Sequence, residues 1–245
     1  MNNLLSAISF SFCCIFSTAN AQDNPTLKKI EYEQGCSFCA GERFTSTLYV
    51  YEEGAFYNIK LDESYTPSEP DQSIITNNTT RHIRYDLKSD SIFELGAMRS
   101  INPQGIIIAE KRKPIDWNLL DSSRVINGHS CKLGIGDFRG RQYYAWYDPS
   151  IKISKGPWKL HGLPGAIVYA EDTTRELYFK ALNFIDLKGT NAFQIILKPD
   201  FPVVARLRFR AMREEIYAKI LNIKPGPESN STYRISIKKN YFEFE

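Results

Sequence analysis

The stretch that decides the fold is FTSTLYVYEEGAFYNIKL, from Phe44 to Leu61. Two sets of side chains alternate along 44–51, with the period of two that is typical of a half-buried strand: Phe44, Ser46, Leu48 and Val50 on one face, and Thr45, Thr47, Tyr49 and Tyr51 on the other. Glu52-Glu53-Gly54 predicts a turn, and the aromatic and β-branched run over 55–61 favours a second strand. Together they predict an antiparallel hairpin.

Further strand patterns lie on both sides of this hairpin. The segments with these patterns are 30–32, 81–87, 91–95, 105–110, 131–136, 142–147, 166–170, 177–184 and 233–237. We expect 81–87 to pair with 91–95, and 166–170 to pair with 177–184. The polar segment 62–80 contains two prolines and predicts a long surface loop. Many short strands with few helices between them indicate antiparallel β topology rather than a βαβ series.

One helical pattern lies near the C-terminus. Five apolar residues fall on one side of a helical wheel there: Ala205, Phe209, Met212, Ile216 and Ile220. They predict an amphipathic helix with flanking arginines, which form a solvated face or contact a membrane or an acidic partner. Its start is ambiguous, because apolar and Arg residues also alternate over 205–210, as in a strand. The predicted fold class is mainly β (α+β): a curved antiparallel sheet or half-barrel with one C-terminal amphipathic helix.

Residues 1–21 differ from the rest of the chain. They contain no Asp, Glu, Lys or Arg, hold an apolar run over 4–16 and end in Ala19-Asn20-Ala21. This pattern predicts a signal peptide that is cleaved before Gln22, leaving 22–245 as a single domain. A membrane anchor needs about 20 uninterrupted apolar residues, and this run is shorter. We therefore expect an exported protein, periplasmic, outer-membrane-associated or secreted, with no transmembrane segment in the mature chain.

Composition limits the classes of partner. Hydrophobic residues make up 42% and charged residues 24%, as in an ordinary globular protein, and the net charge of +3 does not indicate a nucleic-acid partner. Removal of the leader leaves Cys36, Cys39 and Cys131, which predicts one disulfide and one spare thiol. Cys36 with Cys39 is the preferred pair because it needs no long-range geometry, and Cys131 with either is the alternative.

The sequence contains no pattern that defines an active site. A redox role for Cys36-Ser37-Phe38-Cys39 would need a helix N-terminus, whereas a strand-like segment follows this motif. His82, His129 and His161 are scattered, and no Gly-x-Ser-x-Gly, Walker or Gly-x-Gly-x-x-Gly motif occurs. We therefore predict no catalytic residues, no metal and no cofactor.

The most distinctive stretch spans residues 115–172. It contains VINGHSCK at 125–132, FRGRQYYAWY at 138–147 and GPWKLHGLPGAI at 156–167. It resembles the GLPGLI family of exported Bacteroidota proteins, with Ala166 where the family has Leu. The resemblance implies a signal peptide and a β-rich fold, and it implies no established activity or catalytic residue. By fold analogy, such a sheet is similar to LolA-type half-barrels that hold acyl chains.

The signature has two interpretations. In the first, the prolines and glycines determine turns of the backbone. Pro157 and Pro164 restrict φ, and Leu163-Pro164-Gly165-Ala166 predicts a type II turn with positive φ at Gly165. As a ligand or partner surface, it would use the aromatic residues and their neighbours. The residues of that candidate surface are Trp146, Tyr147, Gly156, Pro157, Trp158, His161, Gly162, Leu163, Pro164 and Gly165.

The preferred functional hypothesis is a non-catalytic envelope protein. It would bind an apolar ligand, a peptide or a partner protein in an apolar or aromatic groove on the concave side of the sheet. The alternatives are a hydrolase-type enzyme with unrecognised catalytic residues and a structural subunit of an outer-membrane assembly.

Overall fold

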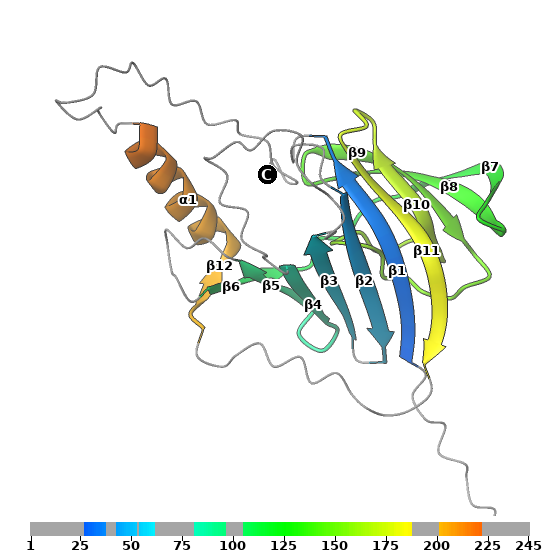
Figure 1. The fold of residues 1–245 in the computed structure, drawn as a ribbon, viewed down its shortest axis with the longest axis horizontal. Helices are drawn as coiled ribbons and strands as arrows, with labels where there is room; N and C mark the ends of the chain where they lie inside the picture. Colours follow the sequence, from blue (N-terminus) through cyan, green and yellow to red (C-terminus); the bar gives the residue numbers. More distant parts are fainter. Residues whose placement is uncertain are drawn as a thin grey trace, which may run out of the picture.

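The computed structural model describes residues 27–37, 43–52, 54–61, 81–96, 105–187 and 201–221. The described elements are β1 (Leu27–Cys36), β2 (Arg43–Tyr51), β3 (Gly54–Leu61), β4 (Arg81–Asp86), β5 (Ser91–Gly96), β6 (Ile106–Lys111), β7 (Asn118–Ile126), β8 (His129–Phe138), β9 (Arg141–Asp148), β10 (Ala166–Asp172), β11 (Leu177–Leu187), β12 (Val203–Ala205) and α1 (Arg206–Leu221). Figure 1 shows their arrangement. The predicted signal peptide, the loop 62–80 and the strand 233–237 lie outside the described residues.

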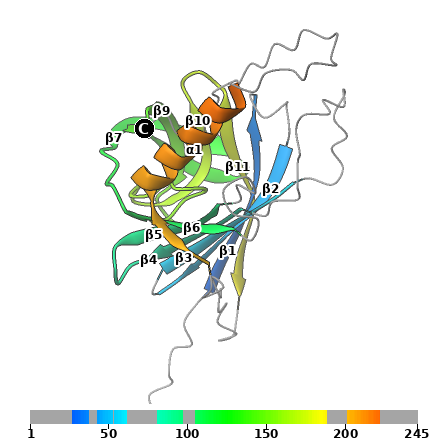
Figure 2. The same cartoon turned by 90° about the vertical axis from the view of Figure 1, so that its left-hand side faces the viewer.

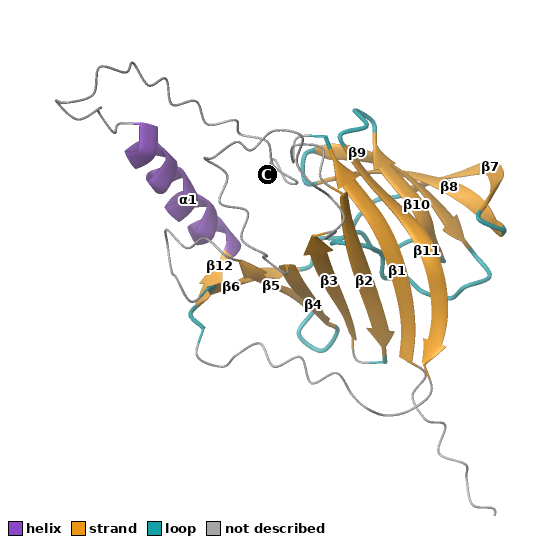
Figure 3. Ribbon diagram, viewed as in Figure 1, coloured by secondary structure: helices purple, strands orange, loops and turns teal. Residues whose placement is uncertain are grey.

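All twelve described strands belong to one sheet, in the order β12-β6-β5-β4-β3-β2-β1-β11-β10-β9-β8-β7. Neighbours pair antiparallel, except that β12 pairs parallel to β6. Strand β1 pairs with β2 on one side and with β11 on the other (Figure 1). It therefore joins the part of the sheet formed by β2–β6 and β12 to the part formed by β7–β11. Figure 3 shows how strongly strands dominate the described chain. The predicted mainly β, antiparallel fold with one helix is confirmed.

The predicted hairpins form with the expected pairings. In the hairpin β2–β3, Leu48 lies opposite Tyr57, and both side chains are buried. Strand β10 also pairs with β11 as expected. Sequence patterns did not predict β7, whose side chains are mostly exposed. It is joined to β8 by Asn127-Gly128, where φ is positive at both residues, as a tight two-residue hairpin turn requires.

Helix α1 follows directly from β12 and begins at Arg206, so the strand interpretation of 205–210 is wrong beyond Ala205. Ala205 is an exposed residue of β12, and α1 begins at Arg206. Phe209 and Met212 pack against Ile106 and Ile108 of β6, as the amphipathic pattern predicts. Figure 2 shows α1 rising from β12 beside the β6 edge of the sheet. Within the described chain, no helix has the length and apolarity that crossing a bilayer requires.

The main core is shared between the sheet and the connection from β9 to β10, residues 149–165. This connection inserts Ile153, Trp158, Leu160 and Leu163 into the core. Trp158 and Leu160 have no exposed surface. Apart from Ile115, between β6 and β7, the remaining buried residues of this core come from β1 and from strands on both sides of it, so the connection packs against one face of the sheet and contacts both parts of it.

Candidate functional site

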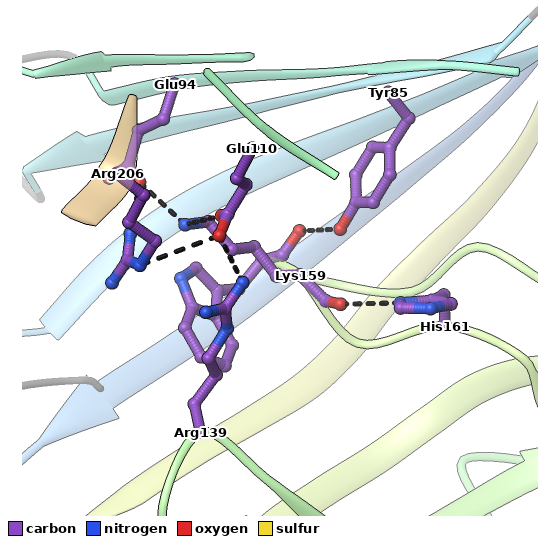
Figure 4. Close-up of polar contacts among 8 residues, drawn as sticks. Tyr85, Glu94, Glu110, Arg139, Lys159, His161 and Arg206 are labelled. Carbon is purple, nitrogen blue, oxygen red and sulfur yellow. Dashed lines mark hydrogen bonds and ion pairs between the residues drawn. The ribbon is translucent and has the colours of Figure 1, made fainter. Parts of the chain in front are cut away.

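Five ionisable side chains from distant parts of the chain meet at one end of this core. We call them the Lys159 cluster, and its members are Glu94, Glu110, Arg139, Lys159 and Arg206 (Figure 4). They come from β5, β6, the β8–β9 turn, the β9–β10 connection and the first residue of α1. Lys159 is fully buried, which is rare for a lysine unless it is paired.

Each carboxylate of the cluster faces more than one cation. Lys159 donates from Nζ to Oε1 of Glu110 at 2.7 Å, and the same Nζ lies 2.8 Å from Oε2 of Glu94. Arg139 donates to the other oxygen of Glu110. Arg206 lies 3.8 Å from Oε2 of Glu94 and 3.6 Å from Oε2 of Glu110. The cluster therefore ties the connection and α1 to the β5–β6 hairpin.

Burial dominates the electrostatics of Lys159. Loss of hydration lowers the pKa of Lys159, while the nearby charges of Glu94 and Glu110 act in the opposite direction. Burial likewise lowers the pKa of Arg206, against the same two carboxylates. The amine is thus less firmly protonated than a surface lysine, and its proton has two acceptors within hydrogen-bond distance.

The local backbone explains how Lys159 reaches the cluster. Trp158, the preceding residue, has φ of +52°, a conformation that a bulky side chain adopts only when its surroundings impose it. The Trp158 ring packs 5.7 Å from the Phe138 ring and 6.4 Å from the Tyr143 ring. Because the indole is held in the core, the next side chain projects toward β5 and β6. Glu94 and Glu110 lie on the inward face of that hairpin, where Glu110 is opposite the buried Ile92.

The signature residues lie mostly inside the protein. Tyr147, Gly156, Pro157, Trp158, His161, Leu163 and Gly165 are buried, Trp146 is half-buried, and Gly162 and Pro164 are exposed. The structure therefore brings most of them together as core and turn residues around the β9–β10 connection. Their role as a partner surface stays a prediction.

The predicted type II turn with positive φ at Gly165 is wrong. Positive φ occurs at Gly162 (+95°) and not at Gly165. Gly165 is required for a different reason: a Cβ there would lie 2.2 Å from the carbonyl oxygen of Asp148 and 2.8 Å from Cα of Pro149. Ala166, the next residue, pairs with Asp148 at the start of β10, so the two backbones pass too closely for any side chain.

The cysteines divide into bonded and free thiols. Cys36 is disulfide-bonded, and Cys131 is a free, buried cysteine. Cys131 is therefore not the partner of Cys36. Cys39 lies outside the described residues, so the Cys36–Cys39 pair stays a prediction. Burial, with a smaller contribution from the Asp148 charge, raises the pKa of the Cys131 thiol to about 11.

His129 and Asp148 form a second polar pair near Cys131. Nδ1 of His129 lies 2.9 Å from Oδ2 of Asp148, and the Ser150 hydroxyl donates to the other carboxylate oxygen at 2.6 Å. Burial opposes ionisation of Asp148, but the Ser150 and His129 hydrogen bonds prevail and lower its pKa. The Cys131 thiol donates to the backbone carbonyl of His129. With its raised pKa, this thiol is protonated at neutral pH and is not an activated nucleophile.

Burial dominates the electrostatics of the other two histidines, His82 and His161. Nδ1 of His161 lies 2.9 Å from the carbonyl oxygen of Lys159, and burial lowers the pKa of this imidazole, as it does for His82. Across the described ranges, no three His, Cys, Asp or Glu side chains converge in a way that could hold a metal ion.

Sequence patterns did not identify the Lys159 cluster. One local signal was present: Lys159 stands between two large apolar residues, Trp158 and Leu160. The inward parity of Glu94 in an alternating strand was a second signal. Neither indicates which charges meet, because Lys159 is 49 residues from Glu110 and 65 from Glu94 along the chain, and these residues converge only in the tertiary structure.

The fold and its buried site define a class: a largely antiparallel, open-sheet β protein with a single described helix. No family model matches the chain, and neither does any curated protein. Among solved structures, PNGF-II in space group P21 is similar, with a TM-score of 0.53 and 11% identity over 76% of this chain and 33% of that chain. Its C2 form gives 0.52 and 11%, over 76% and 32%.

The chain thus spans about a third of the length of PNGF-II. At this identity, the likeness concerns the fold alone. The resemblance to the GLPGLI family stays a prediction.

Proposed function

We propose that this protein is an exported, non-catalytic binding or accessory protein whose β-sheet scaffold presents an outer strand to a partner. The observation that carries this proposal is the contrast between two surfaces. The distinctive signature faces inward, whereas large apolar side chains on β7 face solvent: Leu119 is 50% exposed and Val125 is 70% exposed. Such side chains on an outer strand are suited to contact with another chain.

Strand β7 has the geometry for strand addition. It is the last strand of the described sheet on its side and pairs with β8 alone. Leu119 lies opposite Gly134 and Val125 opposite Ser130, so both side chains point to the same face of the sheet. An outer strand offers unpaired backbone N–H and C=O groups, which an extended segment of a partner can pair with. The partner we propose is an extended peptide or protein segment with apolar side chains on one face.

The finer architecture, a curved half-barrel, belongs to the same proposal. In a half-barrel the inner face would hold an apolar ligand, but here the β9–β10 connection already places Trp158 and Leu160 against that face. One surface pocket, lined by Ile151, Phe184 and residues at the ends of β1 and β11, measures about 130 Å³. Pockets that enclose drug-sized ligands are typically about 300–1,000 Å³. Because the connection occupies that face, we assign binding to β7 rather than to an inner groove.

A crosslinking experiment tests this assignment. The Leu119→Lys, Val125→Lys double variant would be compared with the parent by photo-crosslinking in envelope extracts of the native host. Leu207→Lys is the matched control, because Leu207 is a still more exposed apolar residue, on α1, at 79% exposure. We expect the β7 variant alone to lose a crosslinked product while its melting temperature is unchanged. Equal crosslinking by all three proteins would exclude β7 as the binding surface.

A second candidate function is hydrolysis with His129 as the general base. The observation that favours it is the 2.9 Å contact from Nδ1 of His129 to Asp148, because this contact orients the ring and leaves Nε2 for a substrate or water. Turnover of a p-nitrophenyl ester panel by the parent and by His129→Asn decides between the functions. Equal rates for both proteins would remove the enzyme hypothesis.

A further inference from the structure

The Lys159 cluster places an amine and a carboxyl group in position for a covalent bond. We propose that Lys159 and Glu110 condense to an intramolecular amide, with Glu94 as the residue that transfers the proton. This crosslink would join the β9–β10 connection to β6, independently of any partner at β7. The geometry that points to it is shown in Figure 4.

The reacting groups are held together and away from water. Nζ of Lys159 lies 2.7 Å from Oε1 of Glu110, and no part of Lys159 is exposed. Fixing two groups in contact replaces a bimolecular encounter by a unimolecular step, with effective concentrations far above those in solution. Exclusion of bulk water also opposes the reverse reaction, hydrolysis of the amide.

The charged side chains around Lys159 and Glu110 favour both deprotonation of the amine and formation of the tetrahedral intermediate. Attack requires a neutral amine, and burial of a lysine favours the neutral form. Glu94, 2.8 Å from Nζ, is positioned to accept the proton that the ammonium group releases. Arg139 donates to Oε2 of Glu110, and Arg206 lies 3.6 Å from the same oxygen. Both guanidinium groups therefore face the oxygen that carries negative charge in the tetrahedral intermediate.

The step balances without an oxidant or a reductant. Glu94 takes one proton from the Lys159 ammonium group, and the neutral Nζ forms a bond to Cδ of Glu110. The bond from Cδ to Oε1 then breaks. The departing oxygen leaves as water with two protons that began on Nζ, one of them passed through Glu94. The ion pair becomes an amide plus water, and Glu94 regains its starting state.

The wild-type protein decides the proposal by mass. Full-length protein exported by its host would be denatured, reduced and digested with trypsin. We expect a branched peptide that joins the Glu110 segment to the Lys159 segment, lighter than its two parts by one water molecule, and no cleavage after Lys159. Recovery of the two segments only as separate linear peptides would overturn the proposal. This result does not depend on the folding of any variant.

Three variants test the assigned roles. Lys159→Arg retains the charge but removes the reactive amine, so it should show no branched peptide. Glu110→Gln should lose ammonia instead of water and so yield a product of the same mass as the crosslinked parent. Glu94→Gln should slow or abolish condensation, whereas full condensation in Glu94→Gln would remove Glu94 from the mechanism. A branched peptide in Lys159→Arg would show that another amine reacts.

Discussion

The phenolic hydroxyl of Tyr85, on β4, donates a hydrogen bond to the backbone carbonyl of Trp158, in the middle of the β9–β10 connection. The two residues are 73 positions apart and almost completely buried. Tyr32 on β1 makes a similar contact, donating to the carbonyl of Ile167 at 2.9 Å. The sheet thus satisfies carbonyl groups of the segment that fills its own face, since a buried carbonyl without a donor is costly.

Removing the Tyr85 hydroxyl should therefore destabilise the protein. Tyr85→Phe leaves the buried carbonyl of Trp158 without this donor, and we expect a loss of about 1–3 kcal/mol in the free energy of unfolding. Tyr178→Phe is the control, because the Tyr178 hydroxyl bonds to Glu33 at a half-buried position and water can replace it. Urea denaturation measures both. Equal effects would mean that burial of the Trp158 carbonyl carries no special cost.

The stability of the protein should depend both on the size of the Trp158 side chain and on the positive φ of this residue. Trp158→Ala removes a fully buried indole and should cost about 3–5 kcal/mol. Trp158→Gly removes the same ring but relieves the positive φ of this residue, which costs about 1–2 kcal/mol for a residue with a Cβ. We expect Trp158→Gly to melt above Trp158→Ala. The reverse order would contradict strain at this position.

Gly162 and Gly165 of the signature should differ in the size of their effect when each is replaced by alanine. Gly162→Ala meets no atom closer than 3.6 Å, so its cost should be the positive-φ penalty of about 1–2 kcal/mol. Gly165→Ala instead drives Cβ into the Asp148 backbone and should cost on the order of 3 kcal/mol. Thermal melts of the two variants give the comparison. A smaller loss for Gly165→Ala would mean that the backbones separate easily.

A second buried ion pair offers a test that is independent of the Lys159 cluster. Arg141 donates to Asp172, and Asp172 also accepts hydrogen bonds from the Thr174 hydroxyl and the backbone N–H of Leu177. Asp172→Asn leaves Arg141 with a weakened set of acceptors in the interior and should cost about 3–5 kcal/mol. The control is Asp186→Asn in the exposed pair with Lys28, which should cost about 0–1 kcal/mol. Chemical denaturation that ranks them equally would contradict this account.

The thiol of Cys131 should resist alkylation and contribute to stability in a pH-dependent way. Its folded pKa is about 11, above the value of 9.0 for an unperturbed thiol, so the folded state holds its proton more tightly than the unfolded state does. That contribution is fully present below pH 9 and is lost as the pH rises toward 11. Cys131→Ala should flatten the fall in stability over this interval relative to the parent. An identical pH profile for both proteins would contradict the raised pKa.

Local pattern alone determined the main strands, several of their pairings and the helix. The alternation along 44–61 specifies a hairpin because a strand has a period of two and one face must be buried. Phe209 and Met212 identified the buried side of α1 for the corresponding reason, a period near 3.6. Strand β7 carried no such signal, because an outer strand with mostly exposed side chains needs no alternating pattern.

Only the tertiary structure decided what the conspicuous residues do. Gly165 is glycine because the Asp148 backbone passes beside it, a constraint set by a strand partner and not by its own turn. Lys159 meets Glu94, Glu110 and Arg206 because the β9–β10 connection folds over the sheet and α1 begins at its edge. Charges that are far apart in the sequence carry no local signature of their meeting, since Coulomb energy depends on distance in space and on burial.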